Sequence, residues 1–309
     1  MLMNQNRDCA KIGLVTVLYH SDDLLPGFFK SLSRQQFDGY HLYLIDNTPT
    51  ADTKRLIDSL AREHPIEKLT YVPNDRNRGA AQGNNQGIEL SIRDGNRYSI
   101  LLNNDIEFEQ ADLLARIYEQ AEQNNEVMIV PKILFFDSRK IWMAGGKFLK
   151  WRGYTAHIGT CDDDRPDYDV PGYVDYAPTT FMLIANRLFE EVGLLDPAYF
   201  IYFEDTDFVF RAGRCEYQIF YMPQLVVFHK ESSTTGGIGS PLFTYYFNRN
   251  RIYFIWKNFR GVQRVVALCV TLLGNVRKLL LYRGKHRKAV LNACRDGLGL
   301  CYRGSKTGT

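Results

Sequence analysis

The sequence predicts an α/β protein, in which a mostly parallel sheet flanked by helices is followed by a helical, basic C-terminal region. Short apolar, β-branched segments alternate with longer segments whose apolar residues recur at helical spacing. Polar residues stand where several of the short segments end. With 309 residues, 45% hydrophobic and 24% charged, the chain has the composition of a soluble globular protein and can bury a proper core.

The N-terminal third is predicted to form three strand–helix pairs and a fourth strand. The strands are expected at 12–20, 40–45, 69–72 and 98–102, and the helices at 24–35, 52–62 and 79–92. Strands that alternate with helices of about a dozen residues are typical of βαβ units and a parallel sheet. Because the crossovers in such units are nearly always right-handed, the carboxyl ends of these strands are expected on one edge of the sheet.

The regular pattern weakens in the second half of the chain. A strand is predicted at 127–134, a strand and then a helix across 176–181 and 183–192, a helix at 206–213, and a last strand at 218–228. The segment 140–174 shows no clear period and is typical of binding loops or lids. Its acidic run, 162–164, follows no strand and is interpreted as a solvated loop rather than a metal site.

Polar residues cluster at the predicted strand ends. They are Tyr19 and His20, Asp46 and Asn47, Asn74 and Asp75, and the run Asn103, Asn104 and Asp105. Each is also an ordinary turn sequence, since Asn and Asp are common turn formers. Together they favour the rim of a nucleotide pocket, because ligands of open α/β sheets bind just beyond the carboxyl ends of the strands. Asp46 is then placed to accept a hydrogen bond from a base N–H or a ribose hydroxyl.

The sequence lacks the two common phosphate-binding loops. No GxGxxG follows the first strand, which counts against a dinucleotide dehydrogenase, and there is no GxxxxGK[ST]. A metal ion is therefore the expected partner of a diphosphate. The Asp105 carboxylate beside two amides suits a hard divalent cation, and His229, at the end of the last strand, is a candidate second contact. A lone histidine at such a place is more often structural.

Two further segments carry candidate site residues. Asn77 and Gly79 open a helix rich in small residues that continues through Asn84, where free backbone N–H groups favour anions. Tight packing of that helix on the sheet explains the small residues equally well. Glu204 and Asp205 lie among aromatic residues, where carboxylates are costly unless they have partners or a function. Capping of the following helix is the alternative role for Asp205.

These segments, in their order, resemble the family-2 glycosyltransferases with the GT-A fold. The branch they resemble holds rhamnosyl- and galactofuranosyltransferases of bacterial surface polysaccharides. The matching pieces, across about residues 11–235, are 16–21, 45–47, 77–79 with 84–87, 102–105, 202–207 with Arg211, and 228–229.

The resemblance implies a nucleotide-sugar donor, a divalent cation (Mg²⁺ or Mn²⁺) and inversion at the anomeric carbon. Asp105 would be the metal ligand and His229 a second contact, while Asn103 replaces the first acid of the family's DxD motif. Asp205 falls on the catalytic base, with Glu204 beside it. The donor-binding residues implied are Tyr19, Asp46, Asn47, Asn77, Gly79, Asn84, Asn103 and Asn104, with Arg249 on a phosphate of donor or acceptor.

The C-terminal region is strongly basic. From Lys257 to Thr309 there are twelve Lys and Arg against one acid, a net +11, which leaves −8 for the remainder of a chain of net charge +3. The stretch 262–281 is apolar but broken by Arg264, Arg277 and Lys278, and its uncharged part is shorter than the about 20 residues needed to span a bilayer. It predicts a helix lying on an anionic membrane surface. A helix packed on the body, or a dimer contact, is the alternative.

The chain is thus predicted to hold a catalytic domain at 1–240 and a helical, membrane-associating region at 241–309. The predicted function is an inverting, metal-dependent glycosyltransferase at the inner face of the cell membrane. It would move a sugar from dTDP-rhamnose or a UDP-sugar to a lipid-linked or polysaccharide acceptor of a bacterial surface glycan. A homo-oligomer is possible.

The other readings are a nucleotidyltransferase and a catalytically weak, membrane-bound nucleotide-sugar binder. Nucleic acid is not an expected partner, because the body is acidic. Six cysteines without CxxC spacing indicate a reducing compartment, and residues 1–10 lack the apolar core of a signal peptide.

Overall fold

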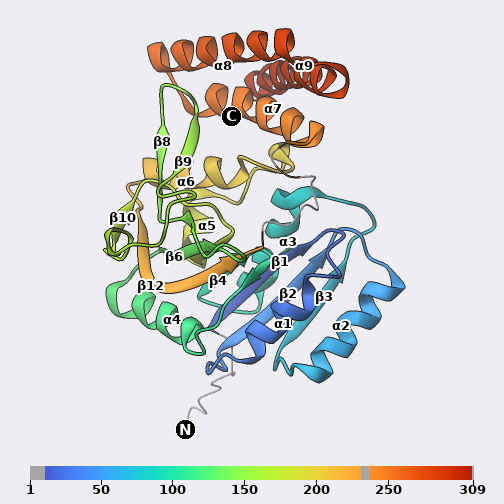
Figure 1. Cartoon of the computed structure of the whole chain (residues 1–309), viewed down its shortest axis with the longest axis vertical. Helices are drawn as coiled ribbons and strands as arrows, with labels where there is room; N and C mark the ends of the chain where they lie inside the picture. The colour runs from blue at the N-terminus through green and yellow to red at the C-terminus, as the bar shows by residue number, and fades with distance from the viewer. Residues whose placement is uncertain (1–10, 231–236, 238, 308–309) are drawn as a thin grey trace.

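The structure, a computed structural model, describes residues 11–230, 237 and 239–307. The polar stretch 1–10 and the Ser/Thr run 232–235 therefore lie outside the described residues. Within the described part, ten strands form one mixed sheet in the order β10-β12-β6-β11-β4-β1-β2-β3, with β5 and β7 attached to its strands β12 and β6. Helices flank this sheet, and the C-terminal helices stack at one end of the molecule (Figure 1).

The predicted βαβ arrangement of the N-terminal third is confirmed. Its strands are β1 (Ile12–Leu18), β2 (Tyr40–Asp46), β3 (Leu69–Pro73) and β4 (Tyr98–Leu102), and its helices are α1 (Leu25–Ser33), α2 (Ala51–Glu63) and α3 (Gly79–Arg93). All three neighbouring pairs, β4 with β1, β1 with β2 and β2 with β3, are parallel. The central strands are buried on both faces, which explains why they are apolar almost throughout rather than alternating.

The second half adds an antiparallel strand to this sheet. The elements are β5 (Ile106–Glu107), α4 (Leu113–Asn124), β6 (Met128–Phe135), β11 (Phe181–Ala185), α5 (Asn186–Val192), η2 (Pro197–Tyr199), α6 (Glu204–Arg214) and β12 (Ile219–His229). β11 lies antiparallel between β4 and β6, and β12 is parallel to β6. The strand placed around 176–181 is in fact 181–185, and α4 has no counterpart in the sequence prediction.

The segment 140–174 contains regular structure that the sequence did not predict. It holds β7 (Ile141–Met143), the antiparallel hairpin of β8 (Gly146–Leu149) and β9 (Tyr154–His157), η1 (Pro166–Tyr168) and β10 (Gly172–Val174). Strands of three or four residues are too short to give a periodic signal. In the acidic run, Asp162 and Asp163 are exposed as predicted, whereas Asp164 accepts from the buried Lys132 ammonium at 2.8 Å.

The C-terminal helices are α7 (Pro241–Asn258), α8 (Gly261–Leu281) and α9 (Gly284–Thr307). A hydrophobic cluster separate from the sheet core joins them to the loop ahead of α6; its buried members are Tyr199, Phe203, Phe254, Ile255, Phe259 and Ala267. The domain boundary predicted at residue 240 stays a prediction. α7, which follows it, shares this hydrophobic cluster with the region before it. Among the described helices, none combines the length and the apolar character needed to cross a bilayer.

Candidate functional site

The sheet brings the predicted polar strand ends to one edge. β1 to β4 run in the same direction, so Tyr19, Asp46, Asn74 and Asn103 all follow carboxyl ends on that edge. β12 is parallel to β6, and β6, like β4, is antiparallel to β11. The end of β12 therefore lies on the same edge, and with it His229.

Asp105 and His229, 124 positions apart, meet through the short strand β5. β5 pairs with the end of β12 so that Ile106 stands opposite His229. The Lys230 backbone N–H donates to the Asp105 carbonyl at 2.9 Å, and His229 Nε2 lies 3.3 Å from Asp105 Oδ2. Both side chains are buried. The pair named from sequence as metal contacts is thus assembled by backbone pairing between β5 and β12.

The atoms around this pair fit a divalent cation with its diphosphate. Asn104 Nδ2 and His229 Nδ1 are buried and have no hydrogen-bond partner within the described part of the chain. Buried polar atoms of this kind need partners, which a bound ligand supplies. No group of three or more His, Cys, Asp or Glu side chains among the described residues could hold a metal alone. A cation held by Asp105 and His229 would complete its shell with donor oxygens and water, as Mg²⁺ commonly does.

The second half of the site is the acidic start of α6. The loop before it is strained, because Phe200, Tyr202 and Phe203 have φ of 66°, 65° and 75°, in the left-handed region that non-glycine residues rarely adopt. This conformation presents Glu204 and Asp205 in the first turn of the helix.

The Asp205 carboxylate is held by donors on both oxygens. Oδ1 accepts from the Thr206 backbone N–H at 2.5 Å, and Oδ2 accepts from the Tyr176 hydroxyl at 2.9 Å. Glu204 is buried, and its Oε2 has no hydrogen-bond partner in the described structure. The two neighbouring acids are therefore in different environments.

Burial raises the pKa of both acids, and hydrogen bonds distinguish them. Burial, with the neighbouring Asp205 charge as the second cause, raises the pKa of Glu204 to about 8. Burial also raises the pKa of Asp205, but the hydrogen bonds from Tyr176 and Thr206 oppose that rise because they favour its charged form. Hydrogen bonds thus favour the charged form of Asp205, the form that a general base requires, and leave Glu204 as the acid that is more readily protonated.

The strained loop is fixed by α7. Asn250, fully buried, donates from Nδ2 to the carbonyls of Tyr199, Ile201 and Tyr202 at 3.0, 2.8 and 2.7 Å. Arg249 donates from Nη2 to the carbonyls of Ala198 and Tyr199, both at 2.7 Å. Arg249 was predicted to contact a phosphate; the structure shows it bracing this loop, and the phosphate role stays a prediction.

Asp207 anchors α6 to α7 from inside the protein. Its side chain is fully buried and accepts from four groups: the Tyr199 hydroxyl, Arg211 Nε, Lys257 Nζ and Asn258 Nδ2, at 2.7–3.0 Å. Asp207 and Arg211, four positions apart on α6, form an ion pair at 2.8 Å. This set of donors gives Asp207 a structural role.

The residues predicted to bind the donor base and ribose have several internal partners. Asp46 accepts from the Tyr71 hydroxyl and the Thr48 N–H, both at 2.8 Å, and a carboxylate can accept more. Asn47 accepts from Asn74 Nδ2 and the Arg78 N–H and donates to the Gly79 carbonyl.

Asn77 Oδ1 accepts from the Gly79 N–H at 2.8 Å, which shapes the start of α3. Tyr19 and Asn84 are partly exposed, and Asn103 is exposed. Asn47 and Asn77 thus shape the loop at the start of α3, while Tyr19, Asn84 and Asn103 keep surface open to solvent.

Three aromatic residues that sequence reasoning missed connect the two halves of the site. The Trp142 ring lies 4.6 Å from the rings of both His229 and His157, and His157 stacks on Tyr176 at 6.1 Å between centroids. Burial lowers the pKa of His157 to about 4, so it stays neutral beside the expected cation position. In the sequence Trp142 belongs to a segment without a clear period, and its position depends on the β7 and β8–β9 pairings.

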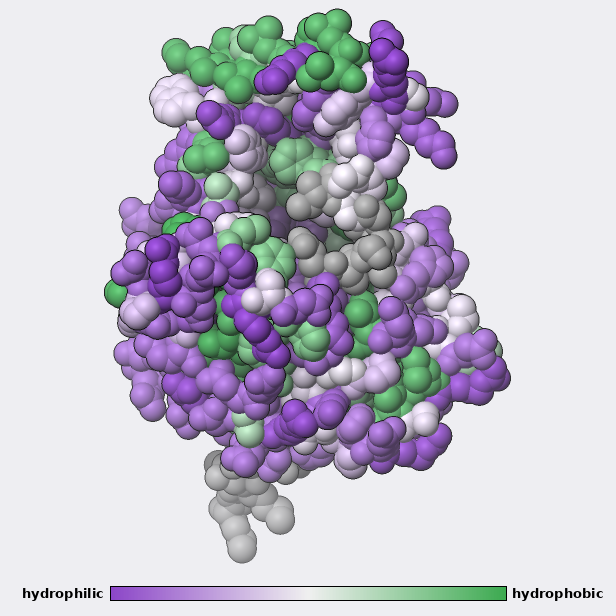
Figure 2. Space-filling view, in the orientation of Figure 1, coloured by the Kyte–Doolittle hydropathy of each residue, from purple (hydrophilic) through white to green (hydrophobic). Residues whose placement is uncertain are grey.

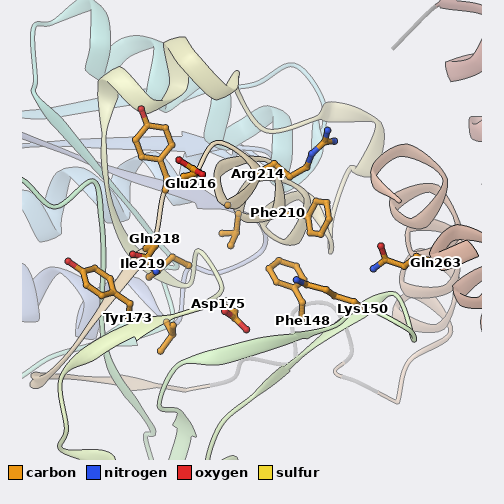
Figure 3. A pocket seen from close by; sticks show the side chains of 14 residues that line it. Phe148, Lys150, Tyr173, Asp175, Phe210, Arg214, Glu216, Gln218, Ile219 and Gln263 are labelled. Carbon is orange, nitrogen blue, oxygen red and sulfur yellow. The ribbon is translucent and has the colours of Figure 1, made fainter. Parts of the chain in front are cut away.

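A cavity of about 570 Å³ lies elsewhere on α6 (Figure 3). Phe210 and Arg214 from the C-terminal half of α6 line it together with Phe148, Tyr173 and Asp175. None of the predicted site residues lines this cavity, and Asp205 lies in the first turn of the same helix. The candidate site is therefore the polar edge of the sheet and not this cavity.

Comparison with known proteins gives consistent matches. Residues 14–184 match the family model described as glycosyl transferase family 2. The low-salt glycan biosynthesis hexosyltransferase Agl10 of Haloferax volcanii is 24% identical over 208 residues, covering 66% of this chain and 62% of that protein. The chain thus matches less than two thirds of that relative's length.

Two solved structures show the same fold. The mannosyltransferase PcManGT from Pyrobaculum calidifontis, in complex with GDP-Man and Mn²⁺, superposes with a TM-score of 0.59 at 12% identity, over 93% of this chain and 87% of that one. GalNAc-T7 with UDP, GalNAc and Mn²⁺ gives a TM-score of 0.64 at 14% identity, over 93% of this chain and 55% of that one. The architecture is accordingly the GT-A fold.

Proposed function

Because this chain belongs to glycosyl transferase family 2, we propose that it is an inverting, metal-dependent hexosyltransferase acting on a nucleotide-diphosphate sugar. The observation that carries the proposal is the meeting of two half-sites on one sheet edge. The buried Asp105–His229 pair would bind a cation and diphosphate, and Asp205, whose charged form is favoured by two hydrogen bonds, would act as the base. Trp142, His157 and Tyr176 connect the two in one chain of contacts.

The reaction follows from the charge state of the acids. Asp205 accepts the proton of the acceptor hydroxyl while that oxygen forms a bond to the anomeric carbon, and the bond from that carbon to the diphosphate oxygen breaks. Attack on the face opposite the leaving group inverts the anomeric configuration. Glu204, protonated at neutral pH, adds no second negative charge beside the nucleophile. A bound divalent cation would stabilise the charge on the departing diphosphate.

The finer identity of the substrates also belongs to the proposal. We expect dTDP-rhamnose or a UDP-sugar as donor, and a lipid-linked or polysaccharide hydroxyl as acceptor, with the protein held peripherally at the inner membrane face. Support comes from the relatives, which include a hexosyltransferase of glycan biosynthesis, a mannosyltransferase in complex with GDP-Man and Mn²⁺, and GalNAc-T7 with UDP, GalNAc and Mn²⁺. Because Asn103 stands in place of an acid, the cation would depend more on the oxygens of the nucleotide-sugar donor as ligands.

A thermal-shift screen tests the proposed donor site. Nucleotide-diphosphate sugars are added with and without Mn²⁺, and at about 100 times Kd a true donor should raise Tm by about 2–4 °C. Asp105→Asn should lose the Mn²⁺-dependent part of the shift while keeping the Tm of the free protein within a few degrees. A full Mn²⁺-dependent shift in that variant, or no shift with any nucleotide sugar, would count against the site.

A further inference from the structure

Helix α8 has its polar face turned inward and its apolar face outward. Its buried residues are Ala267, Thr271 and Asn275. Asn275 Nδ2 donates to the Cys294 sulfur of α9 at 3.4 Å, and Lys278 Nζ donates to Asn248 Oδ1 of α7 at 2.7 Å. This is the reverse of a surface helix in water, whose apolar stripe normally faces the core.

The outward apolar residues form one stripe along the whole helix. They are Val262, Val265, Leu272, Leu273, Val276 and Leu280, with exposed fractions from 37% to 82%; Val270 and Leu281 are exposed as well. Steps of three, four, seven or eight positions link the six, which puts them on one side of a helix about 30 Å long. Figure 2 shows the corresponding apolar atoms gathered along the upper edge of the molecule, where Figure 1 places α8. A contiguous exposed stripe of this kind marks a contact surface.

The charges around this stripe are almost all positive. α8 contains no acid, and Arg277 is exposed near the edge of the stripe. Arg283, before α9, and Lys285, Arg287 and Lys288, at the start of α9, are exposed as well. The net charge from Lys257 to Thr309 is +11. Two copies meeting through this face would bring two such regions together and repel each other. An apolar stripe bordered by cations is complementary to anionic lipid headgroups above acyl chains.

We infer that the outward face of α8 lies on an anionic lipid bilayer, with the helix axis in the membrane plane and the stripe about 5–10 Å deep. The inner face of α8 packs on α7, whose Asn250 and Arg249 hold the loop that presents Asp205. Docking through α8 would therefore hold the candidate site close to the membrane. Delivery of a lipid-linked acceptor rests on the proposed function, whereas membrane binding itself does not.

Vesicle sedimentation with a matched pair of variants tests this inference. Full-length protein is mixed with vesicles of phosphatidylcholine and phosphatidylglycerol (3:1), or of phosphatidylcholine alone, at low and high salt. We expect binding to the mixed vesicles that weakens with salt and with loss of the anionic lipid. Leu273→Glu should weaken it about tenfold or more. Val170→Glu is the control, because Val170 is off the stripe and, like Leu273, is 69% exposed.

Two further readouts separate the possible outcomes. Light scattering gives the mass of each protein, and the thermal shift with nucleotide sugar and Mn²⁺ reports the donor site, which Leu273→Glu should leave unchanged. Equal vesicle binding by wild type and Leu273→Glu overturns the inference, as does a wild-type dimer that Leu273→Glu dissociates. Failure of vesicle binding with an intact donor shift rejects this inference, and with it the peripheral membrane location, but leaves the proposed sugar transfer standing. Intact vesicle binding without any donor shift rejects the proposed function alone.

Discussion

Which of Glu204 and Asp205 carries the negative charge depends on a few hydrogen-bonding atoms. Burial raises the pKa of both carboxyls, but Asp205 accepts from Tyr176 and Thr206, whereas Glu204 Oε2 has no hydrogen-bond partner in the described structure. Hydrogen bonds to a carboxylate favour its charged form, so the negative charge is expected on Asp205. The sequence identifies the acidic pair; it does not identify Tyr176, which sits 29 positions earlier and forms only an isolated bridge with Gly146.

Tyr176→Phe should move the pH profile of the reaction. The Tyr176 hydroxyl lowers the pKa of Asp205, so its removal raises that pKa. A base must be ionised to accept a proton, and the acid limb of kcat/KM should therefore shift to higher pH. The measurement is kcat/KM against pH. The control is Tyr221→Phe, which removes a buried hydroxyl that donates to the Tyr168 carbonyl instead. If the acid limb of Tyr176→Phe does not move, Tyr176 does not set the pKa of the catalytic base.

Among the elements, α3, α6 and α7 meet at the strained loop 200–203. Gly79, with φ of 79°, lies against this loop, and a Cβ on it would come within 2.5 Å of the Phe200 carbonyl oxygen. The Ala81 N–H donates to that same oxygen at 3.2 Å. The start of α3, predicted to bind donor, and the loop that presents Asp205 are thus in direct contact. Gly83 and Gly87 of the same helix lie against Val17 and Val15 of β1, so small residues in α3 also serve its packing on the sheet, the alternative that the sequence left open.

Gly79→Ala should destabilise the protein by about 2–4 kcal/mol, through the left-handed backbone and the contact with Phe200. It should also lower turnover more than Gly213→Ala does. Gly213 is the matched control, because a Cβ there meets nothing within 4 Å and its φ is not left-handed. Chemical denaturation and initial rates check both effects. Equal stability of the two variants would show that the close approach at Gly79 does not hold.

Elements with a long periodic pattern were predictable from sequence. Very short strands, and contacts between residues far apart in the chain, were not. The strands and helices up to β4 follow from their spacing. β5, two residues long, gives no pattern, yet it places Asp105 against His229. Likewise, nothing local to Asn250 indicates that it binds three carbonyls some 50 positions away. The candidate site residues were therefore predicted from residue type and strand position, while the groups that orient them are seen only in the structure.

At the scale of the whole molecule, the sheet and the C-terminal helices each contribute one part of the site. The sheet edge assembles the Asp105–His229 pair, and α7 holds the loop that presents Asp205. The basic region predicted as a surface helix is a helix, α8, and its apolar residues face outward. One end of the molecule thus carries an exposed apolar and basic face on α8, which packs on α7, the helix that braces the loop before Asp205.

The most direct test of the central claim is turnover by Asp205→Asn. Release of nucleoside diphosphate is measured with a donor identified by thermal shift, with Mn²⁺ and a glycan or lipid-linked acceptor. Loss of a positioned base predicts a fall of about 10²–10⁴-fold in kcat. The Mn²⁺-dependent donor shift should stay within a degree or so of wild type, because Asp105 and His229 are untouched. Turnover close to wild type in Asp205→Asn would contradict the assignment of the base and with it the proposed mechanism.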